Sequence, residues 1–339
     1  MKIRGRLIKT LYQIGWLAPV VLAVFQAGLA VGVRLQRRAG EVRADAKTLA
    51  PLREISHTYR FISPLLAVGD AEELHDFAAL EREVGDRIRD TTAAGQASTI
   101  SVYFRDLNSS RWMGVNADER FAPASLYKVA TMIAYLKTAE TRPEILTTSV
   151  IYDPANSPSR PEDDATVSTI VPGKPYTVTQ LITHMIVASD NDAAALLIHG
   201  LNRNLMAEVF GNLGLALPAD GDLGDTMSAK SYSLFFRILY NASYLGRSTS
   251  EQALELLSQT TFRDGLEAGV PAGVTVSHKF GHRVLPNGEE LHDCGIIYAP
   301  QKPYLLCIMT RGDTIAGLTQ SIRDISRLIY GMMVEPAQP

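Results

Sequence analysis

The sequence predicts an α+β domain in which an antiparallel sheet is flanked by helices. Strand-like alternation of apolar and polar residues occurs near both ends of the chain, whereas its middle third carries long apolar stretches at helical spacing. The turn sequence Pro286-Asn287-Gly288 separates two of the late strands and is typical of a hairpin. Because strands at both ends flank a helical middle, we expect the sheet to join distant parts of the chain.

The first elements of this domain follow a capping signal at Asp70. A helix is predicted for residues 71–88, where apolar residues recur at helical spacing and indicate a core-facing side. Two strands, residues 99–105 and 111–115, follow around the turn residues 106–110. The apolar positions of the helix are Leu74, Phe77, Leu80, Val84 and Ile88.

The later elements are predicted in the same way. Three apolar helices are expected at residues 125–139, 178–199 and 229–245. Strands are then expected at residues 274–283, 291–298 and 304–310, and a final helix at residues 315–332 closes the domain.

The amino-terminal residues predict a membrane anchor. Residues 11–33 form an apolar run long enough to cross a hydrocarbon core, and basic residues lie on both sides of it. We interpret residues 1–34 as a basic flank and an uncleaved signal anchor, although Gly28 and Ala30 leave a cleavage site open. Acidic residues follow the anchor but do not precede it, which favours an extracytoplasmic catalytic domain. Residues 35–69 are interpreted as a juxtamembrane spacer that is partly helical, and residues 70–339 as the α+β domain. The alternative for residues 11–33 is a buried core helix.

Composition excludes several other classes of protein. A net charge of -3 provides no basic surface for nucleic acid. Cys294 and Cys307 are too few for a disulfide framework and lack the short spacing of a zinc or thioredoxin-like site, and whether they pair is left open. We expect no cofactor and no metal.

Three short motifs carry the chemistry, and the first is Ser125-Leu126-Tyr127-Lys128. Residues three apart on a helix share a face, so Lys128 can act as a base beside the hydroxyl of Ser125. The helix start, marked by Pro123, favours a developing alkoxide and disfavours a charged lysine. Taken alone, the motif is equally consistent with a helix cap and a solvated lysine.

The other two motifs are Ser189-Asp190-Asn191, after an apolar helix, and Lys279-Phe280-Gly281, in a strand. Each has an ordinary explanation, because polar residues commonly cap helices and a lysine in a strand usually points to solvent. Their order along one chain argues against coincidence.

Together the motifs resemble those of the class A β-lactamase and penicillin-binding-protein superfamily of serine hydrolases, which has S-x-x-K, S-D-N and usually K-T-G. The resemblance covers roughly residues 70–333 and implies a β-lactamase/D,D-peptidase-like fold with a mainly helical half. It implies a Ser125 acyl-enzyme, with Lys128 and Ser189 also catalytic. It implies that Asn191, Lys279, Gly281 and His282 bind substrate: Lys279 holds a carboxylate, and the backbone N–H groups of Ser125 and His282 form the oxyanion hole. The resemblance also implies structural roles in the site for Asp190 and Phe280.

The chain departs from the superfamily pattern in two places. Phe280 replaces a threonine, and the E-x-x-L-N stretch that supplies the deacylating glutamate is absent from the sequence. Asp220 and Asp222 are the acidic residues nearest to where that glutamate would be. The predicted function is hydrolysis of β-lactam amides. The alternatives are a D,D-carboxypeptidase or penicillin-binding protein acting on peptidoglycan peptides, and a slowly deacylating sensor or pseudoenzyme.

A metal site is a further alternative from a different class of enzyme. Residues His278, His282, His292 and Asp293 lie on one predicted hairpin and could converge as ligands. Adjacent residues of a strand point oppositely, however, so His292 and Asp293 are not expected to share a ligand set.

Overall fold

The computed structural model describes residues 52–53, 58–67, 77–154, 168–218, 224 and 226–334 of the 339-residue chain. The chain divides into two compact units, Met1–Leu49 and Ala50–Pro339, and every described residue belongs to the second. The predicted anchor, residues 11–33, lies outside the described residues. No helix in the described part of the chain is both long and apolar enough to cross a membrane.

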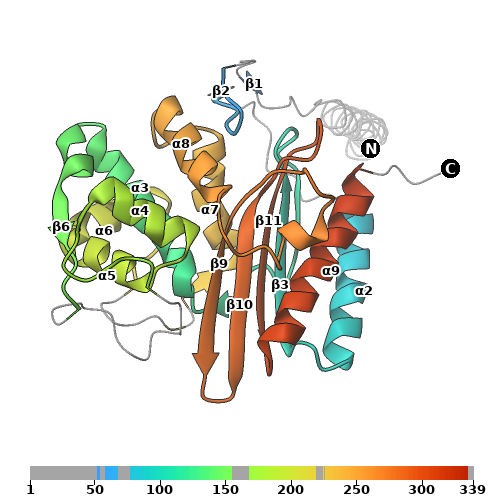
Figure 1. Ribbon diagram of the computed structural model, residues 1–339. Coiled ribbons are helices and arrows are strands. Elements are labelled where there is room, and N and C mark those ends of the chain that lie inside the picture. Colours follow the sequence, from blue (N-terminus) through green and yellow to red (C-terminus); the bar gives the residue numbers. More distant parts are fainter. Residues whose placement is uncertain are drawn as a thin grey trace, which may run out of the picture. The chain divides into compact units, whose positions relative to one another are not determined.

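A five-stranded antiparallel sheet forms the centre of the second unit (Figure 1). Its strand order is β4-β3-β11-β10-β9, so the early strand β3 pairs with the late strand β11, as expected from the sequence. The strands are β3 (Thr99–Asp106), β4 (Trp112–Val115), β9 (Val276–Leu285), β10 (Gly288–Ile297) and β11 (Tyr304–Gly312). The predicted hairpin joins β9 to β10, and Gly288 accepts the positive φ of its turn. Strand β9 is an edge strand, which leaves one side of its backbone available to other elements.

Helices α2 (Ala78–Ala93) and α9 (Ile315–Val334) cover one face of the sheet (Figure 1). Both helices bury one apolar stripe and form a single core with the strands beneath them. Full burial of each large apolar side chain stabilises the fold by roughly 1.5–3 kcal/mol. Fully or nearly fully buried members of this core include Leu80, Val84, Ile308, Leu318 and Ile322.

The opposite face packs against α7 (Ala229–Tyr240), which belongs to the mainly helical half. Together with inward-facing residues of the sheet, this half builds the second core. The other helices of this half are η1 (Ala124–Leu126), α3 (Tyr127–Ala139), η2 (Pro143–Thr147), α4 (Val178–Val187), α5 (Asn191–Gly200), α6 (Arg203–Asn212) and α8 (Arg247–Leu257). Short paired strands are β5 (Arg120–Phe121) with β8 (Met227–Ser228), and β6 (Ser149–Ile151) with β7 (Pro175–Thr177).

Three predicted helices differ from those observed. The helix predicted for 71–88 is found at 78–93, because Phe77 adopts φ 71° and a right-handed helix cannot pass through that conformation. The helix predicted for 178–199 is two helices, α4 and α5, separated by Ser189 at φ 55°. The helix predicted for 229–245 ends at Tyr240. Helices α6 and α8 were not predicted, although their buried residues Met206, Val209 and Phe210, and Ala253, Leu254 and Leu257, recur at helical spacing.

Part of the predicted spacer packs against the domain. Phe61 and Ile62 are buried, and the carboxylate of Glu251 in α8 accepts hydrogen bonds from the backbone N–H groups of both. Strand β2 (Leu65–Ala67) pairs with β1 (Leu52–Arg53), and the guanidinium of Arg53 donates to Asn241 Oδ1 at 2.8 Å. These described residues therefore belong to the compact unit.

Candidate active site

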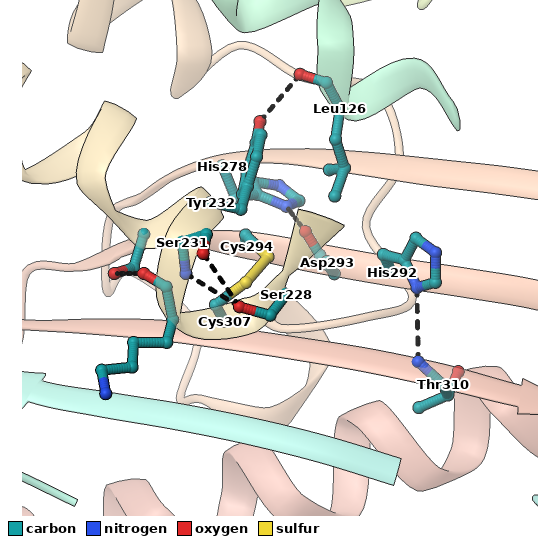
Figure 2. Close-up of a disulfide and its surroundings, with 12 residues drawn as sticks. Leu126, Ser228, Ser231, Tyr232, His278, His292, Asp293, Cys294, Cys307 and Thr310 are labelled. Carbon is teal, nitrogen blue, oxygen red and sulfur yellow. Dashed lines mark hydrogen bonds and ion pairs between the residues drawn. A yellow bond between two sulfur atoms is a disulfide. The ribbon is translucent and has the colours of Figure 1, made fainter. Parts of the chain in front are cut away.

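The first motif lies on a tight turn that opens α3. Ala124 adopts φ 47°, and the half-buried Ser125 follows it in η1. A non-glycine residue in this conformation is strained, and such strain is concentrated at functional sites. The turn is held from α7, where the buried Tyr232 hydroxyl donates to Leu126 O at 3.0 Å (Figure 2). Burial raises the pKa of Tyr232 well above its ordinary value, so the hydroxyl stays protonated and able to donate.

The second motif lies at the break between α4 and α5. Asp190 is fully buried and caps α5, because its Oδ1 accepts from the N–H of Ala193 at 2.9 Å. Its Oδ2 accepts from the hydroxyl of Thr169 at 2.7 Å and from the backbone N–H of Thr169 at 2.5 Å. These bonds fix the residue that follows Ser189, which itself adopts a left-handed conformation at φ 55°.

Lys128 connects the first two motifs. Its Nζ donates to Ser189 O at 2.5 Å, to Asn191 Oδ1 at 2.6 Å and to Ser189 Oγ at 3.2 Å. The lysine is 5% exposed. It therefore connects the start of α3, just after Ser125, to the break that carries Ser189.

Lys279 brings the third motif to the same hydroxyl. It is completely buried on β9, and its Nζ donates to Ser189 Oγ at 2.8 Å and to Phe280 O at 3.0 Å. A serine hydroxyl has two acceptor lone pairs and one proton. With two lysines donating to Ser189 Oγ, both lone pairs are used, and the proton is left for a third partner.

The electrostatics of the two lysines are unusual for a protein interior. Burial, and then the neighbouring charge of Lys128, lower the pKa of Lys279 well below its ordinary value, while Asp293 acts in the opposite direction. The positive charge of Lys128 disfavours a second positive charge on Lys279. The surroundings of Lys279 therefore favour its neutral form, which can accept a proton.

The rest of the third motif contacts the turn of Ser125. A Cβ added at Gly281 would lie 2.9 Å from Pro123 O and 3.1 Å from Leu126 Cγ, so only glycine allows this close approach. His282 follows on the same edge strand, and its Nε2 lies 2.5 Å from Glu289 Oε2. Phe280 stacks on Phe262, with ring centroids 4.5 Å apart. The fold thus brings the three predicted motifs together.

A disulfide lies beside Lys279 in the sheet. Cys294 is opposite Lys279 in the register of β9 and β10, and it bonds to Cys307, its partner on β11 (Figure 2). Both cysteines are fully buried. The pairing that the sequence left open is therefore formed.

The histidines and aspartate weighed as metal ligands make other contacts. His278 Nδ1 lies 2.7 Å from Asp293 Oδ1, whereas His292 Nε2 lies 3.0 Å from Ala122 O and its Nδ1 accepts from the N–H of Thr310 (Figure 2). Burial lowers the pKa of His292 to about 4. Among the described residues, no group of three or more His, Cys, Asp or Glu side chains is placed to hold a metal ion.

Three residues of the site were not singled out from the sequence. Thr169 bonds to Asp190 from 21 positions upstream, Tyr232 bonds to Leu126 O from 106 positions downstream, and Phe262 stacks on Phe280. The spacing of the motifs contains no signal for such long-range partners. Tyr232 falls within a predicted helix, but nothing in that pattern separates it from an ordinary core residue.

Known proteins resemble this chain over most of the described domain. The family model described as the β-lactamase enzyme family matches residues 83–333. β-Lactamase L2 of Stenotrophomonas maltophilia is 35% identical over 163 residues, which cover 48% of this chain and 42% of that protein, so this alignment spans under half of the relative. A β-lactamase of Streptomyces lavendulae is 24% identical over 302 residues, covering 82% of this chain and 90% of that protein.

Solved structures share the fold. A variant of PBP-A, determined as an acyl-enzyme complex with penicillin G, superposes with a TM-score of 0.65 at 21% identity, covering 75% of this chain and 96% of that one. At this identity the likeness concerns the fold alone. Because the family match itself extends over residues 83–333, the chain belongs to the β-lactamase enzyme family and is a β-lactamase-like serine hydrolase.

Proposed function

We propose that the chain cleaves β-lactam amides by acyl transfer, with Ser125 as the nucleophile. Ser125 attacks the carbonyl carbon, its proton passes to Lys128, and the C–N bond breaks as Ser189 protonates the leaving nitrogen. The acyl group then remains on Ser125 Oγ until water releases it as an acid. The backbone N–H groups of Ser125 and His282 would stabilise the oxyanion.

The observation that carries this proposal is the hydroxyl of Ser189, to which both Lys128 and Lys279 donate hydrogen bonds. Its proton is free for the leaving nitrogen, and either lysine can replace it afterwards. Lys128 would complete the route in its neutral form, since its Nζ contacts Ser189 and it lies three residues after Ser125, at the start of α3. Asn191 would position Lys128, because its Oδ1 accepts from the Lys128 ammonium group at 2.6 Å, and we propose that it also contacts the substrate.

A second candidate is a penicillin-binding protein or D,D-carboxypeptidase that releases its acyl group slowly. The absence of an E-x-x-L-N stretch from the sequence favours it, and a mutant of PBP-A, a neighbour in fold, was determined as an acyl-enzyme complex with penicillin G. Asp220 and Asp222, the nearest acidic residues in sequence, lie outside the described residues. Replacing each by asparagine tests for a substitute base: the residue that serves should slow release of the adduct without slowing its formation.

The nucleophile is tested by Ser125→Ala. The variant should lose covalent labelling by a fluorophosphonate probe, because no other residue is expected to form the adduct. Ser277→Ala is the matched control, since Ser277 is a buried serine whose hydroxyl donates to Leu254 O at 2.7 Å, away from the motifs. Labelling of Ser125→Ala at the rate of the wild type would contradict the proposal.

We also propose that residues 11–33 anchor the chain in a membrane, with the catalytic domain outside the cytoplasm. The apolar run and its basic flanks support the anchor, and the disulfide Cys294–Cys307 supports an oxidising compartment. Full-length protein should sediment with membranes, and protein lacking residues 1–38 should not. Recovery of the full-length chain wholly in the cytosolic fraction would refute the anchor.

A further inference from the structure

Two adjacent threonines in the segment between α8 and β9 bond to the segments that carry the second and third motifs. The hydroxyl of Thr260 donates to His278 O on β9 at 2.9 Å. The next residue, Thr261, donates to Val187 O at the end of α4, through its backbone N–H at 3.0 Å and through its hydroxyl at 3.1 Å. We name Thr260 and Thr261 the threonine clasp.

Both acceptors are backbone oxygens of positions that commonly lack a partner within their own element. The last carbonyl groups of a helix have no partner inside it, and Val187 ends α4. β9 is an edge strand, so the carbonyl groups on its outer side have no partner within the sheet. Thr260 is completely buried, and a buried carbonyl that loses its donor destabilises the fold. The threonine clasp therefore satisfies one carbonyl on each element.

The two acceptors lie close in sequence to the groups that meet in the site. His278 directly precedes Lys279, and Val187 lies two positions before Ser189. Lys279 Nζ donates to Ser189 Oγ at 2.8 Å. Adjacent Cα atoms are about 3.8 Å apart across a trans peptide, so a dipeptide that is bonded at both residues limits how far α4 and β9 can separate.

The same segment is attached to His278 a second time, through the side chain. Asp293 Oδ1 lies 2.7 Å from His278 Nδ1 (Figure 2). The other oxygen of that carboxylate, Oδ2, accepts from the backbone N–H of Leu266 at 2.9 Å. Residues 260–266 are therefore joined to β9 at both of their ends, which fixes the strand next to Lys279.

We infer that the threonine clasp holds the second and third motifs at the distance at which Lys279 contacts Ser189, and that Thr260 is a positioning residue for acylation. The inference rests on the proposed acyl transfer at Ser125, in which Ser189 protonates the leaving nitrogen. Loss of the Thr260 hydroxyl removes the buried donor to His278 O, so β9 can move away from α4 and the contact between Lys279 and Ser189 lengthens. Displacement of a catalytic group by about 1 Å can slow a reaction on the order of 10²-fold.

Thr260→Val and Thr260→Ser test the inference in the full-length chain. Valine keeps the shape of threonine without the hydroxyl, and serine restores the hydroxyl. Thr138→Val is the matched control, since Thr138 is a buried threonine whose hydroxyl donates to Ala134 O at 2.8 Å within α3. Intact mass follows acylation of Ser125 by benzylpenicillin and its labelling by a fluorophosphonate. Hydrogen–deuterium exchange follows the Thr261 amide, and thermal melting confirms that each variant is folded.

Thr260→Val should slow acylation by benzylpenicillin about tenfold, whereas Thr260→Ser and Thr138→Val should react at the rate of the wild type. The fluorophosphonate should label all variants at the rate of the wild type, because fluoride leaves without a proton from Ser189. A role in stability alone would not separate the two reagents. The Thr261 amide should exchange faster than in the wild type in Thr260→Val and in neither of the other variants.

The inference is overturned if Thr260→Val is acylated at the wild-type rate, if it slows equally with both reagents, if Thr138→Val slows as much, or if the Thr261 amide exchanges unchanged. If Thr260→Val does not fold, Thr261→Val decides, because it loses only the hydroxyl bond to Val187 O; acylation at the wild-type rate then overturns the inference. If the fluorophosphonate labels Ser125 and penicillin does not, the proposed substrate fails and the exchange of the Thr261 amide decides the inference. If neither reagent reacts, both fall.

Discussion

The two faces of the central sheet bury their ionisable groups in different ways. On the face covered by α9, His278 and Asp293 are buried together, and the groups bond directly to each other at 2.7 Å. On the face of the helical half, two buried lysines, Lys128 and Lys279, donate to one hydroxyl. Pairing His278 with Asp293 limits the energetic penalty of burial, whereas placing two lysines at one serine increases it. The difference indicates that the first arrangement serves stability and the second serves chemistry.

Among the variants that test this difference between the two faces, Ser189→Ala should have the largest effect on the rate of acylation. Removal of the hydroxyl takes away the proton donor to the leaving nitrogen, and acylation of Ser125 should fall by roughly 10²–10⁴-fold. Stopped-flow acylation by a chromogenic β-lactam measures the change. Ser277→Ala, on the same strand as Lys279, should leave the rate unchanged. Equal rates of acylation for Ser189→Ala and Ser277→Ala would show that the two lysines and Ser189 have no role in the chemistry.

On the α9 face the expected effect is on stability and not on rate. Ile322→Ala leaves a cavity in the apolar core under α9 and should lower the free energy of unfolding by about 2–5 kcal/mol. Urea unfolding measures this loss. The rate of acylation per folded molecule should stay within a factor of two of the wild type, because the α9 face contributes to stability and not to the chemistry. A large drop in that rate would show that the two faces are coupled.

The uncharged His292 predicts a loss of stability in acid. Its folded-state pKa of about 4 lies below the ordinary value near 6.5, so the unfolded chain binds the proton first as the pH falls. Its contribution is therefore complete above pH 6.5 or so and is lost progressively down to about pH 4, with a total on the order of 3 kcal/mol. In His292→Gln this part of the pH dependence of urea unfolding should disappear. If the free energy of unfolding of His292→Gln changed with pH between 4 and 6.5 as steeply as that of the wild type, another group would cause the acid sensitivity.

The smallest effect is expected from Thr169→Val. The substitution keeps the shape and the backbone N–H but removes the hydroxyl that donates to Asp190 Oδ2. The free energy of unfolding should fall by about 1 kcal/mol, and acylation should slow a few-fold because the break that carries Ser189 is held less firmly. Thr179→Val is the matched control, since that hydroxyl bonds to Leu146 O away from the site. Identical behaviour of the two variants would mean that Thr169 does not position the second motif.

The sequence predicted the sheet better than the helical half. The alternation of apolar and polar residues over 99–105 and the turn at Pro286-Asn287-Gly288 are local sequence patterns. Strands β3, β9 and β10 are found where these patterns predicted them. The break between α4 and α5 was not predicted, because apolar residues continue on both sides of Ser189 and because the bonds of Thr169 to Asp190 beside it come from a distant segment. Tertiary contacts of this kind are absent from a local pattern.

The candidate site was predictable as a set of motifs but not as a network. The order of Ser125, Ser189 and Lys279 named the three segments that the fold brings together. Nothing in their spacing showed that both lysines would donate to Ser189 Oγ, or that the Phe280 ring would lie near one of them. Those features depend on how β9 lies beside the turn at Pro123, which Gly281 permits.

The most direct test of the account is the fate of the wild-type chain in the presence of a labelled penicillin, followed by intact mass and peptide mapping. We predict a single adduct on Ser125 that forms faster than it is released, because the acylating residues are present and the E-x-x-L-N glutamate is not. Loss of a general base slows a step by roughly 10²–10⁴-fold, so the adduct should persist long enough to be mapped. An adduct on another residue, or a chain that carries none while the penicillin stays intact, would contradict acyl transfer at Ser125.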